Sequence, residues 1–203
     1  MKRNQITVSF VGVFKELQRM IPQLDSEFCR NVFDDPDSTF AANIPDGFII
    51  KHKINPVPAI AITPQKVVIV ATDLNLLFNY IESIKAKLPL YDFAAYGINQ
   101  EIEWLELESD ANRWIFDRFI RPELRIKDKK ALCNKLNLQF GINESQELFI
   151  ELEPRNGMSN GLFASINHHN QYAIKGFPSK TKLKDLFTLS EATVDEYLNS
   201  LIC

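Results

Sequence analysis

Glycine is scarce in this chain, with 7 among 203 residues. Loops that cradle phosphates need closely spaced glycines, because only glycine lets the backbone approach the phosphate oxygens closely. Neither a GxGxxG nor a GxxxxGK[ST] pattern occurs, and no GxSxG nucleophile elbow is present. These absences argue against dinucleotide-binding, P-loop and serine-hydrolase classes, although a catalytic triad assembled in space needs no local signature.

Cysteine is also rare, and its spacing excludes the common cysteine-based sites. Cys29, Cys133 and Cys203 lie far apart, are odd in number and form no CxxC or cysteine–histidine pattern. Zinc sites and redox motifs both need such spacing. We therefore expect reduced thiols in a cytoplasmic protein and no cofactor.

The chain has no apolar run near the roughly 18 residues that a membrane-spanning helix requires, so we expect no membrane partner. The first residues combine a basic start with an apolar run, as signal peptides do, but Ile6, Val8 and Phe10 alternate with other residues as in a strand. The net charge of −3 gives no overall basic field that would recruit nucleic acid.

Hydrophobic residues are plentiful, at 45% with 15 phenylalanines, which is enough to bury a sizeable core. We predict one α+β domain over residues 1–203, with a largely antiparallel sheet and helices packed on it. Residues 1–89 and 90–203 share an order of strand, helix, strands and helix, which suggests two βαββα-like pseudo-repeats. The composition, rich in Lys, Asn and Ile, suggests a bacterial or phage source.

The clearest folding unit is residues 56–89. Two runs of β-branched and apolar residues, 59–62 and 67–71, flank a turn at Pro64 and predict a hairpin. The second run is apolar on both faces, which favours an internal strand. Thr72 or Asp73 can cap a following helix, whose apolar stripe must pack against the sheet.

The other segments predict further elements around this unit. They are a strand from Ile6, a helical stripe over 14–32 interrupted by Pro22, an acidic connector over 34–47, an extended segment over 91–107 with a bend or bulge near Gly97, a helix capped by Ser109 or Asp110, a hairpin of 136–142 with 148–152, an exposed edge strand over 162–166 and a helix from Ser190.

Two glutamate pairs and a histidine are the candidate catalytic residues. Glu101 and Glu103 share one strand face, and so do Glu151 and Glu153. If the two strands were neighbours, the carboxylates would converge, and with His168 they could hold a divalent cation for a metal-dependent hydrolase. The simpler interpretation, which we favour, is two solvated strand faces that are not adjacent and a histidine in a polar turn or strand end.

A basic segment lies between residues 113 and 130, and phosphates of nucleic acid would suit it. Acidic residues interspersed in the segment reduce its net charge and favour a solvated helix and loop. Its cationic residues, the candidate binding residues, are Arg113, Arg118, Arg121, Arg125, Lys127, Lys129 and Lys130.

The sequence thus favours a non-catalytic cytoplasmic protein that acts through protein–protein contacts, with a partner or with further copies of itself. A metal-dependent hydrolase and a nucleic-acid-binding accessory protein are the alternatives. The leading prediction rests on ample core-forming sequence without a catalytic or cofactor pattern, and on exposed strand edges that could pair with a partner.

Overall fold

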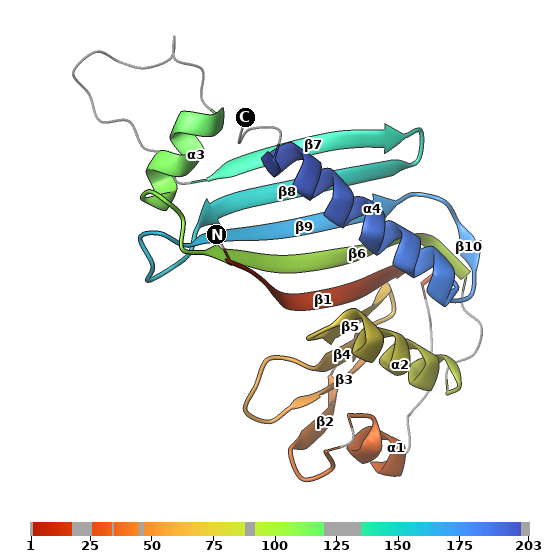
Figure 1. The fold of residues 1–203 in the computed structure, drawn as a ribbon. Coiled ribbons are helices and arrows are strands. Elements are labelled where there is room, and N and C mark those ends of the chain that lie inside the picture. The colour runs from red at the N-terminus through yellow and green to blue at the C-terminus, as the bar shows by residue number, and fades with distance from the viewer. Residues whose placement is uncertain are drawn as a thin grey trace.

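The computed structural model describes residues 2–17, 26–33, 35–44, 47–87, 92–119 and 135–199. Ten strands form one antiparallel sheet in the order β2-β3-β4-β5-β1-β6-β9-β8-β7, with β10 beside β6 (Figure 1). The predicted α+β class is confirmed. In chain order the elements are β1 (Lys2–Phe14), α1 (Ser26–Asn31), β2 (Thr39–Ile44), β3 (Gly47–His52), β4 (Ala59–Ile62), β5 (Lys66–Ala71), α2 (Leu74–Lys85), β6 (Asp92–Leu105), α3 (Ala111–Phe119), β7 (Leu136–Asn143), β8 (Gln146–Pro154), β9 (Leu162–Asn170), β10 (Ile174–Lys175) and α4 (Lys180–Asn199).

The first strands of the two chain halves, β1 and β6, pair at the centre of the sheet. The remaining strands of the first half extend from β1 on one side, and β9, β8 and β7 extend from β6 on the other. Each stretch runs strand, helix, four strands and helix, and the division into pseudo-repeats stays a prediction. The central position of β1 and β6 matters for function because side chains from both halves meet there.

The hairpin and helix of residues 56–89 form as the sequence predicts. β4 pairs with β5, and β5 lies between β4 and β1 inside the sheet. Asp73 caps α2, since its carboxylate accepts hydrogen bonds from the backbone N–H groups of Asn75 and Leu76 at 2.9 and 3.0 Å. This cap satisfies donors that the first helical turn otherwise leaves free.

Helices α2 and α4 pack on the same face of the sheet (Figure 1). One row of paired residues crosses this covered face from β3 to β9, and every member is fully buried: Ile50, Ile60, Ile69, Phe10, Ile98 and His168. The alternation of apolar residues in the strands places them on this side because successive side chains point to opposite faces. No helix of the described chain is long and apolar enough to cross a membrane.

Helix α4 contributes to two apolar clusters, and a buried polar pair lies between them. Leu183 and Leu186 belong to the cluster under α2, whereas Val194 belongs to the cluster of β7–β9 and α3. Between them, the Gln100 amide donates to Ser190 Oγ at 2.8 Å, and both side chains are fully buried. This hydrogen bond fixes the position of α4 on the sheet, because buried polar groups need hydrogen-bond partners.

Several sequence predictions about individual elements are wrong. The acidic connector contains a strand, β2, and Phe14 ends β1 instead of starting a helix. The 162–166 run is no edge, because β9 pairs with both β6 and β8. The last helix begins at Lys180, ten residues before Ser190.

The irregularity predicted near Gly97 lies three residues away from it. β6 continues through Gly97, and its register with β1 shifts between Ala95 and Phe93, opposite Val13 and Phe14. The glycine has a different role, because a Cβ at this position would lie 2.6 Å from the carbonyl oxygen of His168. Because it has no side chain, Gly97 allows β6 and β9 to approach each other closely.

Candidate functional site

The face of the sheet opposite α2 and α4, here called the open face, has no helix packed on it within the described chain (Figure 1). Over β3, β4, β5 and β1 its side chains are largely apolar, and over β6, β9, β8 and β7 they are largely polar and acidic, apart from Phe149 and Phe163. The open-face residues include Thr7, Ser9, Val11, Val13, Val70, Gly97, Asn99, Glu101, Glu103, Gly141, Glu147, Glu151, Glu153, Phe163, Ser165, Asn167 and His169.

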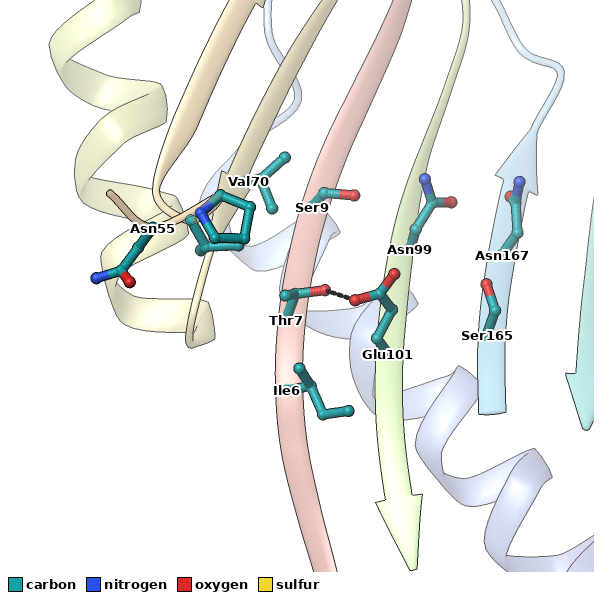
Figure 2. A pocket seen from close by; sticks show the side chains of 11 residues that line it. Ile6, Thr7, Ser9, Asn55, Val70, Asn99, Glu101, Ser165 and Asn167 are labelled. Carbon is teal, nitrogen blue, oxygen red and sulfur yellow. Dashed lines mark hydrogen bonds between the residues drawn. The ribbon is translucent and has the colours of Figure 1, made fainter. Parts of the chain in front are cut away.

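A groove of about 600 Å³ runs over the open face at the junction of β5, β1, β6 and β9. Figure 2 shows its floor as two rows of side chains from neighbouring strands. The strand registers define the rows, which are Val70, Ser9, Asn99 and Asn167 in one and Thr7, Glu101 and Ser165 in the other. The volume falls in the range of small-molecule sites, so the groove can admit a side chain or a small ligand.

The loop between β3 and β4 supplies one wall of the groove. Asn55, Pro56 and Val57 line it from this loop, and Ile6 lines it from β1. Three of these four side chains are apolar, in contrast to the polar floor. The groove thus offers a ligand hydrogen-bonding groups on one side and apolar contact on the other.

Four floor residues have side-chain hydrogen-bonding groups without a partner among the described residues: Ser9, Asn99, Ser165 and Asn167. Their backbones are held in the sheet, so the side chains project from a rigid base. Such groups on a sheet face are satisfied by water or by a bound ligand. They are therefore available to hydrogen-bond a ligand in the groove.

Glu101 is the charged residue of the groove floor. Its Oε2 accepts a hydrogen bond from Thr7 Oγ1 at 2.9 Å (Figure 2). No lysine or arginine of the described chain pairs with it, while the Gln5 amide donates to the Glu101 backbone oxygen at 3.1 Å. The carboxylate therefore keeps acceptor capacity that faces the groove.

The predicted glutamate pairs lie on the open face, but their strands are not neighbours. β9 separates β6 from β8, with Ser165 between Glu101 and Glu151 and Phe163 between Glu103 and Glu153. Two strand spacings put the pairs about 9.6 Å apart. Among the described residues no group of His, Cys, Asp or Glu is placed to hold a metal ion.

Two of these four glutamates already have cationic partners. Arg155 Nε contacts Glu103 Oε2 at 2.9 Å, and Lys135 Nζ contacts a carboxylate oxygen of Glu151. The charges of Glu103 and Glu151 are thereby partly compensated at the edge of the open face. Glu153 has no ion-pair partner in the described part of the chain.

His168 lies on the covered face, under α4 and away from the glutamates. Its Nδ1 is 3.0 Å from the carbonyl oxygen of Leu186, so Nδ1 carries the proton and donates. Its Nε2 is buried without a partner, as is Oε1 of Gln100. The five residues proposed for a hydrolase therefore do not share one site, and His168 helps to dock α4 instead.

The stability of the protein is expected to fall as the pH drops below 6.5, because of His168. Burial lowers the pKa of His168 below its ordinary 6.5, and the hydrogen bond to Leu186 opposes this only in part. Below pH 6.5 the unfolded chain takes up a proton that the folded chain does not, so unfolding becomes easier. Urea unfolding of the wild-type protein at pH 7.5 and 5.5 measures this loss.

A His168→Gln variant is expected to lose much of that pH dependence, whatever its stability at pH 7.5. His169 offers a matched control, since it is the next residue but lies on the open face. A His169→Gln variant is expected to keep the wild-type difference between the two pH values. Equal pH dependence of stability in the wild type and in His168→Gln would contradict the assignment of this dependence to His168.

The basic segment is only partly within the described residues. On α3, Arg113 Nε pairs with Asp117 at 3.1 Å and the Arg118 guanidinium lies 4.5 Å from the Trp114 ring centroid. These contacts hold both arginines against their own helix. The other candidate residues, Arg121, Arg125, Lys127, Lys129 and Lys130, lie outside the described residues.

Of the polar residues on the groove floor, the sequence patterns pointed only to Glu101. Ser9, Asn99, Ser165 and Asn167 are small polar residues on otherwise apolar strands, a pattern that is common on any half-exposed sheet. Only the pairing of β1, β6 and β9 brings them together. The one available signal was the run of polar residues at alternate positions of 99–103, which the sequence interpretation assigned to glutamates alone.

Comparison with protein-family models, with curated proteins and with solved structures finds no match for this chain.

Proposed function

We propose that this protein is a non-catalytic binding protein that engages a protein partner through the open face of the sheet. The observation that carries the proposal is the groove at the centre of that face, with four partnerless polar side chains beside the Glu101 carboxylate. A face that spans many strands without a covering helix offers an area of the scale that protein–protein contacts need.

The amphipathic pattern of the open face supports a protein partner. Apolar side chains such as Val11, Val13 and Val70 occupy one half, and glutamates occupy the other. Protein interfaces combine apolar and polar regions in this way. Nucleic acid fits less well, because the open face carries five glutamates, which repel phosphate.

Self-association is the second form of this proposal. With β9 in the interior, strand pairing with another copy would use β2 or β7, which lie at the ends of the strand order. β7 contains no charged residue and no proline, the usual protections of an edge strand. Pairing at β7 would leave the open face accessible to a partner.

Site-specific photo-crosslinking in the cells that naturally make the protein tests the proposed function. A photoreactive phenylalanine analogue at Asn167, on the groove floor, is expected to form an adduct with a protein. The same analogue at Ala192, exposed on α4, serves as the control and is expected to form no such adduct. Adding Ser9→Trp, which fills the groove, is expected to suppress the Asn167 adduct.

Absence of a protein adduct at Asn167, or equal adducts at Asn167 and Ala192, would contradict the proposed function. An adduct with nucleic acid in place of protein would contradict it as well and would favour the alternative of nucleic-acid binding.

A further inference from the structure

We infer that the partner presents a basic segment to the open face and that the groove takes a lysine or arginine side chain of that segment beside Glu101. The inference rests on the proposed function and adds the chemistry of the partner to it.

The groove floor has one charged hydrogen-bond acceptor, Glu101, among amide and hydroxyl groups that can accept as well as donate. Glu101 keeps acceptor capacity beyond its hydrogen bond from Thr7, and the side chains of Asn99 and Asn167 add amide oxygens. The hydroxyl of Ser165, on the same row as Glu101, adds a further acceptor. Ammonium and guanidinium groups are pure donors and cations, so they match the Glu101 carboxylate, and the amide and hydroxyl oxygens around it can accept their remaining hydrogens.

The apolar wall suits the rest of such a side chain. Lysine and arginine bury their methylene stems against apolar surface while the charged head reaches polar groups. Pro56 and Val57 on the loop and Ile6 on β1 provide that surface next to the polar floor. A carboxylate or phosphate ligand would meet the same wall but would be repelled by Glu101.

Acidic residues without an ion-pair partner in the described chain also lie on the open face outside the groove. They favour a ligand segment with several basic residues over a single small amine. Glu147 and Glu153, both on β8, have no ion-pair partner among the described residues. Strands β6 and β8 are about 9.6 Å apart. An extended polyproline-type segment repeats its side chains every three residues, or about 9.3 Å, so basic residues at every third position would lie over β6 and β8. Glu153 is two residues along β8 from the Glu101 row, an offset that a flexible lysine or arginine stem can cover.

Binding of a labelled peptide tests the inference. The probe is a fluorescein-labelled peptide of four Lys-Pro-Pro repeats, and the comparison peptide has Glu in place of Lys. We expect fluorescence anisotropy to show binding of the basic peptide alone, with an affinity that falls as salt rises. Failure of the basic peptide to bind, or equal binding of the acidic one, overturns the inference.

Glu101→Gln is the decisive variant, because glutamine keeps an acceptor for Thr7 but removes the charge. We expect it to weaken binding of the basic peptide about tenfold, or ~1.4 kcal/mol. Glu196→Gln makes the same change of net charge on the exposed side of α4 and is expected to leave the affinity unchanged. Equal affinities of wild type and Glu101→Gln overturn the placement at Glu101.

The crosslinked adduct at Asn167 separates this inference from the proposed function. Mass spectrometry of the adduct is expected to identify a segment with at least two lysines or arginines. A neutral or acidic segment overturns the inference and leaves the proposed function standing, whereas the absence of a protein adduct overturns both.

Discussion

Replacement of Phe10 by alanine is expected to lower the free energy of unfolding by about 3–5 kcal/mol. Phe10 is fully buried on β1, between Ile69 of β5 and Ile98 of β6. Its ring centroid lies 6.0 Å from that of Phe93, nearly perpendicular, and 5.7 Å from that of Phe177. Alanine would leave a cavity that these neighbours cannot fill, and urea denaturation measures the cost.

Val13→Ala is the matched control on the same strand. Val13 lies on the open face and is 38% exposed, so its truncation is expected to change stability by no more than about 0.5 kcal/mol. Equal losses from the two substitutions would contradict the assignment of the covered and open faces.

Gly97→Ala is expected to destabilise the fold by about 1–3 kcal/mol, the usual range for overpacking a well-packed site. A Cβ at Gly97 would lie 2.6 Å from the backbone carbonyl oxygen of His168 on β9. Backbone in a central sheet cannot rotate away as a side chain can, so β6 and β9 would have to separate. Because the groove floor is built on these strands, Gly97→Ala is also expected to weaken partner binding.

Gly141 provides a control from the same sequence context. Gly97 and Gly141 are each followed by Ile-Asn, and both lie in one cross-strand row of the open face. A Cβ at Gly141 would meet nothing within 4 Å. Gly141→Ala is therefore expected to be neutral or to stabilise by up to about 1 kcal/mol, because glycine costs backbone entropy in a strand. Equal destabilisation by both substitutions would contradict the close approach at Gly97.

The groove combines residues from both halves of the chain. The groove lies where β1 of the first half meets β6 of the second, so its floor needs both halves of the chain. The buried polar side chains of Gln100, His168 and Ser190 lie under α4 on the other side of these strands.

Local sequence patterns predicted the individual elements well wherever neighbouring residues alone decide the structure. The hairpin of β4 and β5, the Asp73 cap of α2 and the hairpin of β7 and β8 all follow from alternation, capping and turn residues within short segments. Prediction failed where long-range contacts decide the outcome. β2 lies in a segment rich in turn residues and becomes a strand by pairing with β3, and β9 lies in the interior because β6 and β8 both pair with it.

The sequence by itself determined the α+β class, the alternation that gives each strand an apolar and a polar face, and the absence of common nucleotide and zinc motifs. Only the tertiary structure decided the strand order, and the strand order decides which polar residues meet. It placed Glu101 beside Ser165 and Asn99 beside Asn167, separated β6 from β8, and put His168 on the opposite face. The physical reason is that residues up to about 160 positions apart come together only through backbone pairing, which no local pattern encodes.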